Sequence, residues 1–366
     1  MYENDKRVVM TLDAGGTNFV FSAIAGNKEI VEPISFASQP NDLEKCLKTI
    51  ENGFRKVMES IKEKPVAISF AFPGPADYAS GIIGDLPNFP SFRGGVALGP
   101  FLEERFGLPV FINNDGDLFA YGEALSGALV DTNNLLEQNG SNKHYKNLLG
   151  VTIGTGFGGG VVINNQLLSG DNGCGGDVWV FRNKMYSDKI CEESVSIRAV
   201  KRCYEEICGE SAKEMTPKDI FDIAEVTKKG NQNAAVRSFE MLGEVAGNTI
   251  AQALTIVDGL VVIGGGLTGA AKYFLPAIVK EMNGTIGTFA GDIFPRMQMK
   301  AYNLENHAEL NDFLADKSCI IDVPYSTDRH VKYNHVRETG VVISKLGASK
   351  AIALGAYAYA ISKIDM

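Results

Sequence analysis

One short pattern occurs twice in the chain: a β-prone strand, a glycine-rich tip and a second β-prone strand. The first copy is VVMTLDAGGTNFVFSAI at residues 8–24, and the second is NLLGVTIGTGFGGGVVINNQLL at residues 147–168. Alternating helical and strand-like segments follow both copies, and no Pro/Ser-rich linker separates the two halves. We therefore predict two related α/β domains packed around a cleft.

The spacing of apolar residues predicts the other main elements. Residues 8–38 are expected to hold three strands, and PVAISFAFPGP at 65–75 a buried strand followed by a long Gly- and Pro-rich loop to about residue 100. Residues 284–345 give only weak strand-like signals. Helices are expected at residues 41–61, 101–106, 194–208, 216–229, 231–257, 270–282 and 349–363.

Composition and charge narrow the class of protein. Hydrophobic residues make up 45% of the chain and charged residues 22%, which is ordinary for a soluble globular protein. The net charge of −9 disfavours binding to nucleic-acid phosphates. No segment is long and apolar enough to cross a membrane, and the polar start MYENDKR lacks the core of a signal peptide. We therefore expect a cytoplasmic protein, whose six scattered cysteines are free thiols.

The second glycine tip matches a dinucleotide-binding fingerprint only superficially. Residues 154–159 read G-x-G-x-x-G, and Asp177 follows about 20 residues later. The fingerprint requires a helix directly after the glycines, whereas residues 161–163, Val-Val-Ile, are β-branched and strand-like. Both glycine tips are therefore expected to be hairpins, and a Rossmann fold is disfavoured.

A glycine-rich hairpin tip has two interpretations. It is either a tight turn, or a nest whose backbone N–H groups approach a phosphate closely. Two such tips, one on each wall of a cleft, favour the second interpretation, because together they grip a triphosphate from both sides. A third loop, IGGGL at 263–267, follows a strand and precedes a helix, which suits a base and ribose. The sequence has no P-loop and no protein-kinase motif set.

Two aspartates near these loops are candidate functional residues. Asp13 beside a phosphate nest requires a cation between them, and the Mg²⁺ of ATP is the natural one; alternatively, Asp13 caps the turn. Asp115 follows a buried strand in VFINNDGD. It is either a helix N-cap, a role that Asp117 could also take, or a general base for a substrate hydroxyl with Asn114 bonding neighbouring hydroxyls. The local sequence does not separate the two roles of Asp115.

Five motifs in order resemble the ROK sugar kinases of the actin/hexokinase/Hsp70 superfamily. They are LDAGGTN, FPGPADYASGIIGDLPNFPSF, LPVFINNDGDLFAYGE, GTGFGGGVVINNQLLSG and IGGGL. The resemblance implies two actin-like ATPase (RNase H-like) domains around an ATP/sugar cleft. The N-terminal domain would comprise residues 1–122 plus 346–366, and the C-terminal domain residues 123–345 with an extra segment near 284–345.

The resemblance also implies roles for individual residues. Asp115 would be the general base, and the sugar would be bound by Asn114, Asn88, Gly74, Asp177 and Glu193. The nucleotide would be bound by Asp13, Gly15, Gly16, Thr17 and Asn18 in the first loop, by Gly154, Thr155 and Gly156 in the second, and by Gly264, Gly265, Gly266 and Leu267 in the third. Asp13 would hold Mg²⁺ through ATP or water.

The sequence departs from the family pattern in one segment. The family's G-E-I-G-H reads Gly-Asp-Val-Trp-Val at 176–180, so Asp177 replaces the Glu and Val180 the zinc-binding His. Only Cys191 remains of the following zinc loop, and a zinc site is not expected. Glu193 can still serve as a sugar ligand. Trp179, the only tryptophan, is either an apolar wall against the sugar ring or a core side chain.

The leading hypothesis is therefore an ATP-dependent kinase that phosphorylates the primary hydroxyl of a hexose or N-acetylhexosamine, with Mg²⁺ and ATP. The alternative is a non-catalytic regulator of the same family that responds to nucleotide or sugar. A DNA-binding regulator is not expected, because only seven polar residues precede the first strand. The resemblance implies small-molecule partners, with neither nucleic acid nor membrane, and suggests a homodimer.

Overall fold

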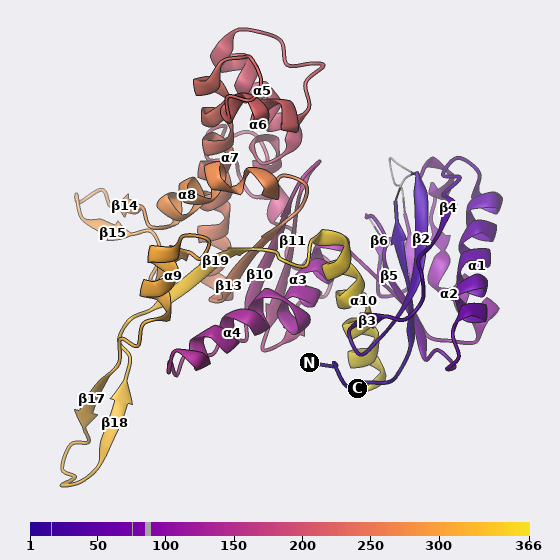
Figure 1. Cartoon of the computed structure of the whole chain (residues 1–366), viewed down its shortest axis with the longest axis horizontal. Helices are drawn as coiled ribbons and strands as arrows, with labels where there is room; N and C mark the ends of the chain where they lie inside the picture. The colour runs from indigo at the N-terminus through magenta and orange to yellow at the C-terminus, as the bar shows by residue number, and fades with distance from the viewer. Residues whose placement is uncertain (16, 75, 85–88) are drawn as a thin grey trace.

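Two six-stranded sheets form the frame of the computed structural model, which describes residues 1–15, 17–74, 76–84 and 89–366 (Figure 1). In the first sheet, β1 pairs antiparallel with β2 and parallel with β5, and β5 pairs parallel with β9. Residues 8–38 hold four strands where three were predicted, since the short β3 also pairs with β2. The strands are β1 (Val9–Ala14), β2 (Asn18–Ala25), β3 (Lys28–Glu29), β4 (Ile34–Ala37), β5 (Ala67–Ala71) and β9 (Val110–Asn113).

The second sheet repeats this arrangement and has the order β12-β11-β10-β13-β19-β16. It again starts with an antiparallel hairpin, in which β10 pairs with β11, and continues with parallel β13, β19 and β16. The two glycine tips are thus hairpins, as predicted. The strands are β10 (Leu148–Ile153), β11 (Phe157–Ile163), β12 (Gln166–Leu167), β13 (Leu260–Gly264), β16 (Lys300–Asn303) and β19 (Glu338–Ile343).

Helices cover both faces of each sheet, because strands buried on both sides need apolar partners on both sides. Buried side chains of α1 (Leu43–Ser60) and α2 (Leu98–Phe106) share a core with one face of the first sheet, and α10 (Ala348–Ile364) packs on the other. On the second sheet, α7 (Gln232–Val257) and α8 (Ala271–Met282) share a core with one face, and α3 (Asp115–Ser126) packs on the opposite face.

The two sheets meet through a close crossing of α3 and α10. A Cβ atom placed on Gly122 would lie 1.9 Å from the carbonyl oxygen of Ala351, and one placed on Gly355 would lie 1.9 Å from that of Leu118. The two helix backbones therefore touch where each carries a glycine. This contact fixes the position of α3, whose first turn carries Asp115.

Most of the other predicted helices are present, with shorter ends. The helix expected at 216–229 ends at Ala224, and α7 restarts after the N-cap Asn231, whose side chain accepts from the backbone N–H of Ala234. The sequence patterns did not indicate α4, α9 or three short strands within the Gly- and Pro-rich loop. The predicted helices at 194–208 and 216–229 are α5 (Ile197–Cys208) and α6 (Pro217–Ala224). The elements that were not predicted are α4 (Ala128–Gln138), α9 (His307–Leu314), β6 (Ala76–Asp77), β7 (Ile82–Ile83) and β8 (Val96–Ala97).

Two small ribbons occupy much of residues 284–345 and extend away from the second sheet (Figure 1). The first pairs β14 (Thr285–Gly287) with β15 (Ile293–Pro295), and the second pairs β17 (Cys319–Asp322) with β18 (His330–Tyr333). Among the described residues, every helix is too short or too polar to span a bilayer.

Candidate active site

The first predicted phosphate loop lies at the tip of the β1–β2 hairpin. Asp13 is exposed near the end of β1, opposite Val20 of β2. Gly15 is needed there, because a Cβ atom on it would lie 2.8 Å from the carbonyl oxygen of Asn18. Thr17 and Asn18 follow, and the Thr17 carbonyl accepts from the N–H of Ser38 at 3.0 Å. Gly16 lies outside the described residues.

The second and third predicted loops lie side by side. Leu267 donates its backbone N–H to the carbonyl of Ile153 at 3.0 Å, and a Cβ on Gly154 would come within 3.6 Å of the Gly266 nitrogen. Gly265 has φ of +96°, and a Cβ there would lie 2.5 Å from the Ile153 carbonyl oxygen. β13 ends at Gly264, and the loop that follows it thus adjoins the tip that holds Thr155 and Gly156.

Glu192, for which the sequence predicted no role, supports the second loop. Its carboxylate accepts from the backbone N–H of Phe157 at 3.0 Å and lies where a side chain on Gly156 would clash. Arg198 donates to Glu192 at 2.8 Å and to the Thr155 carbonyl at 3.4 Å. A guanidinium therefore stands beside this loop, on a helix that begins more than 30 residues further along the chain.

Asn114, not Asp115, is the N-cap of α3. The Asn114 side chain accepts from the N–H of Gly116 at 2.7 Å, and Asp115 is the first helical residue. The helix start lies directly against β11, because a Cβ on Gly116 would be 2.5 Å from the carbonyl oxygen of Gly159. The capping role that competed with catalysis for Asp115 is thus filled by its neighbour.

The Asp115 carboxyl is open to solvent and yet surrounded by protein. The residue is exposed at its surface, but burial raises the pKa of its carboxyl, and the nearby charge of Asp13 adds to that increase. The hydrogen bond from the Gly116 N–H, at 2.9 Å, opposes both effects. The exposed surface and the raised pKa both suit a recessed carboxyl that a substrate can reach. Asp13 and Asp115, from different elements, therefore lie near enough for the charge of Asp13 to act on the Asp115 carboxyl.

Tyr78 and Asp117 lie within electrostatic reach of Asp115. Neither residue was predicted from the sequence to bind the substrate. The Tyr78 hydroxyl donates to the Phe72 carbonyl at 2.9 Å, and it lies 2.9 Å from where a Cβ on Gly74 would be. Burial raises the Tyr78 pKa, which the Asn114 side chain opposes by hydrogen bonding. Asn88, predicted to bind the sugar, lies outside the described residues.

Asp117 is a buried carboxyl in the first turn of α3. It is 4% exposed, and its Oδ1 has no hydrogen-bond partner among the described residues. Burial raises its pKa to about 8, with added repulsion from Asp177 and then Asp115. The carboxyl groups of Asp177 and Asp115 therefore both lie within electrostatic reach of Asp117.

The altered segment at 176–180 lies close to these carboxyls. Asp177 directly precedes the short 3₁₀ turn η2 (Val178–Val180) and makes no side-chain capping hydrogen bond to it. Trp179 is 40% exposed, which excludes the core alternative for its side chain. The buried Cys191 thiol donates to the carbonyls of Val178 and Trp179, at 3.0 and 3.2 Å, and so holds the turn. Among the described residues, no three His, Cys, Asp or Glu side chains are grouped to hold a metal.

Glu193, the other predicted sugar ligand, has two arginine partners. Its carboxylate accepts from Arg198 at 2.8 Å, and Arg202 lies 3.7 Å from it. Its role toward a sugar therefore stays a prediction.

A cavity of about 480 Å³ lies between β1, β2, β3 and α10. Asp13 lines it, and among the described residues no other predicted site residue does. The cavity therefore adjoins the first phosphate loop, and Asp115 and Asp117 do not line it.

The arrangement defines a class of protein. Two sheets that each begin with a glycine-tipped hairpin, joined through crossing helices, form an actin-like ATPase fold. The chain belongs to the ROK family, whose model matches residues 9–308.

Individual relatives agree with this family. The crystal structure of glucokinase from Parabacteroides distasonis is 56% identical over 99% of both chains, with a TM-score of 0.91. A ROK family glucokinase from Streptomyces griseus, solved with glucose and AMPPNP, shares the fold at 19% identity, with a TM-score of 0.59 over 96% of this chain and 98% of its own. N-acetyl-D-glucosamine kinase from Vibrio cholerae is 27% identical over 77% of this chain and 97% of its own length. The chain spans about half the length of several other curated relatives that it matches, 50% for two and 47% for a third.

Proposed function

We propose that this protein is an ATP-dependent sugar kinase, which phosphorylates the primary hydroxyl of a hexose or N-acetylhexosamine. The supporting observation is the position of Asp115. It begins a helix that lies against β11 of the second glycine hairpin, and it is coupled electrostatically to Asp13 at the tip of the first. Phosphoryl transfer needs bound phosphates, charge neutralisation and an oriented nucleophile, and this site offers groups for each task.

In this proposal Asp115 accepts the proton of the attacking hydroxyl. Its partly raised pKa brings the base closer to the pH at which it works, since a general base acts best near the operating pH. The backbone N–H groups of the two hairpin tips would bind the phosphates. Gly264, Gly265, Gly266 and Leu267 would hold the adenosine.

Mg²⁺ fits the residues at the first tip. Asp13 is an exposed carboxylate beside a predicted phosphate loop, and Mg²⁺ binds through one or two carboxylates together with substrate phosphates and water. When bound, Mg²⁺ would neutralise charge on the phosphates. We propose that Asp13 holds this ion directly or through water.

The sugar would lie next to Asn114, Gly74 and Asp177, with Asn88 and Glu193 as further ligands. An aspartate at position 177 is one methylene shorter than the family's glutamate, and Val180 offers no hydrogen bond. Recognition at the end of the sugar remote from the reacting hydroxyl is therefore expected to differ from that in relatives with the G-E-I-G-H sequence.

A non-catalytic regulator is the second candidate, and the arginine pairs of Glu193 favour it. A carboxylate that is already paired with Arg198 and Arg202 must exchange partners before it binds a sugar hydroxyl. A site that binds the sugar weakly would respond to the ligand without phosphorylating it.

We further propose a cytoplasmic protein with the domains 1–122 plus 346–366 and 123–345, which acts on sugar and ATP as a homodimer. The division at residue 122 falls within α3.

An ATP-coupled assay with a panel of hexoses and N-acetylhexosamines tests the kinase proposal. We expect ADP release that depends on one or a few sugars, with the new phosphate ester on the primary carbon by ³¹P NMR. If ATP and a sugar both bind, by calorimetry, but no sugar in the panel stimulates ADP release, the regulator is the better description.

A further inference from the structure

We propose that the cavity between the first sheet and α10 is a second ligand site, which binds a phosphorylated polyol of the size of a sugar phosphate. One wall comes from residues of β1 and β2 that share a face of the sheet, and α10 supplies the other. The volume of about 480 Å³ lies within the roughly 300–1,000 Å³ common for small-molecule sites. Among the described residues, no predicted sugar ligand and no residue of the second or third glycine loop lines this cavity.

A buried serine hydroxyl in the sheet wall has no partner. Ser22 on β2 is 5% exposed and lines the cavity, and its Oγ makes no hydrogen bond to the described residues. It stands opposite Thr11 of β1, which is also buried and also lines the cavity. Leaving a buried hydroxyl unpaired is costly. A ligand with a polar group beside Ser22 would supply the partner.

The turn between β2 and β3 contributes a second unpaired atom, and this one can only accept. The Nδ2 group of Asn27 donates to the Met1 carbonyl at 2.8 Å, which fixes the orientation of the amide. The Asn27 Oδ1 is buried and has no partner among the described residues. Asp13 and Glu29 also line the cavity, and their exposed carboxylates likewise accept. A ligand here must therefore donate hydrogen bonds from several positions, as the hydroxyls of a polyol do.

The start of α10 supplies the opposite kind of group. This 17-residue helix begins at Ala348 without a side-chain cap. The backbone N–H groups of Ser349 and Lys350, which both line the cavity, have no acceptor among the described residues. Unpaired N–H groups and the helix dipole favour an anion at a helix N-terminus. Lys350 and Lys28 add two positive charges to the lining, so this cavity can hold a phosphate group as well as hydroxyls.

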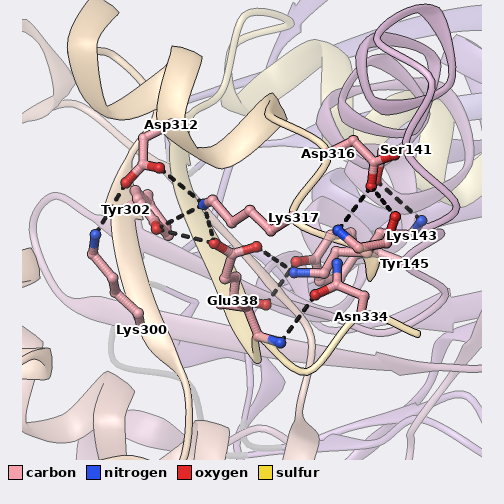
Figure 2. A network of polar contacts seen from close by, with 12 residues as sticks. Ser141, Lys143, Tyr145, Lys300, Tyr302, Asp312, Asp316, Lys317, Asn334 and Glu338 are labelled. Atoms are coloured by element: carbon pink, nitrogen blue, oxygen red, sulfur yellow. Dashed lines mark hydrogen bonds and ion pairs between the residues drawn. The ribbon is translucent and has the colours of Figure 1, made fainter. Parts of the chain in front are cut away.

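The lysines of another charged cluster, on the second sheet, are already paired (Figure 2). There Lys143 and Lys317 both form ion pairs with the carboxylate of Glu338, which is 7% exposed. Their charges balance a buried carboxylate and so stabilise the fold. In the part of the chain that the structure describes, Lys28 and Lys350 form no ion pair. Their charges are therefore available to a ligand.

Apolar side chains complete both walls of the cavity. Val20 and Ile24 line it from β2, and Ile352 and Ala353 line it from α10. The C–H groups of a sugar-sized ring can pack on such side chains, whereas an inorganic anion leaves them in contact with water. The acceptors, the free N–H groups with the lysines, and the apolar walls together match the three parts of a phosphorylated polyol.

Calorimetry on the full chain tests the site, with glucose 6-phosphate as the probe and saturating AMPPNP to occupy the nucleotide site. We expect binding at least about tenfold tighter than that of inorganic phosphate or AMP. Ser22→Ala and Lys350→Gln should each weaken it by about fivefold or more. The matched control is Lys345→Gln, which removes an exposed lysine that precedes α10 and does not line the cavity. It should change the dissociation constant less than about twofold.

The two cavity variants also keep the test independent of misfolding. Lys350 is exposed, and removing the unpaired hydroxyl of Ser22 should leave the melting temperature unchanged or raise it. Equal affinity for glucose 6-phosphate in wild type and in both variants overturns the proposal, as does no binding at about 10 mM. Inorganic phosphate or AMP that binds as tightly as the probe overturns the assigned ligand class. Because the readout is the heat of binding, failure here leaves the kinase proposal standing.

Discussion

At the scale of single residues, Asp115 carries the chemical proposal. We expect Asp115→Asn to lower kcat by about 10²–10⁴-fold, because the amide cannot accept the proton of the attacking hydroxyl. Nucleotide affinity should stay near that of the wild type. Turnover with the preferred sugar and calorimetric binding of ATP measure the two effects. A variant that keeps more than about a tenth of wild-type kcat shows that Asp115 is not the base.

Asp117 gives a prediction on pH and stability. Its folded-state pKa of about 8 lies above the ordinary value of 3.8, so the folded protein holds a proton that the unfolded chain releases. The stabilisation is complete below about pH 4 and is lost as the pH rises toward 8. Asp117→Asn copies the neutral form at every pH. We therefore expect the stability of the variant relative to wild type to increase from pH 5 to pH 9, by an amount of order a few kcal/mol.

Urea unfolding at several pH values measures this difference. The exposed Glu137→Gln, on α4, serves as the control and should show a nearly constant difference. If the two curves for Asp117→Asn and wild type run parallel over this pH range, the carboxyl is ionised in the folded protein.

At the scale of elements, the crossing of α3 and α10 makes a prediction against helix propensity. Alanine is favoured over glycine inside a helix by about 1 kcal/mol. At Gly122, however, the new methyl group would lie 1.9 Å from the Ala351 carbonyl oxygen, and overpacking of this kind costs about 1–3 kcal/mol or more. Gly122→Ala is therefore expected to lower the free energy of unfolding.

The control is Gly269→Ala, where an added Cβ would meet nothing within 4 Å. Chemical denaturation of both variants measures the effect. A stabilised Gly122→Ala protein would mean that the two helices separate easily.

Some of the secondary-structure elements could be predicted from the sequence alone, and others could not. Both glycine-tipped hairpins and the long helices followed from local patterns, because β-prone runs around glycine and amphipathic periodicity need no tertiary information. The β17–β18 ribbon was not recognised, since its exposed face mixes Ile320 with Asp322, Lys332 and His330 and so shows no clear alternation. Glu192, Tyr78 and Asp117 were missed as site residues for another reason: only the packing of distant segments brings them to the predicted loops.

At the scale of the whole molecule, we expect no stoichiometric zinc. Structural zinc requires four closely placed Cys or His ligands, and the Cys191 thiol, the remnant of the family's zinc loop, donates to two backbone carbonyls instead. Elemental analysis should find much less than one zinc per chain, and dialysis against EDTA should leave the melting temperature unchanged. One zinc per chain that is released only on unfolding would contradict this expectation.

The position of Trp179 has a consequence for optical experiments. It is the only tryptophan of the chain, it is 40% exposed, and it lies two residues from Asp177. Light at the red edge of the protein absorption spectrum therefore excites only one side chain of the 366 residues, that of Trp179. Acrylamide quenching and the emission maximum thus report from the surroundings of η2 alone. The protein contains an intrinsic fluorophore at its proposed sugar site, and ligands can be titrated there without attaching a dye.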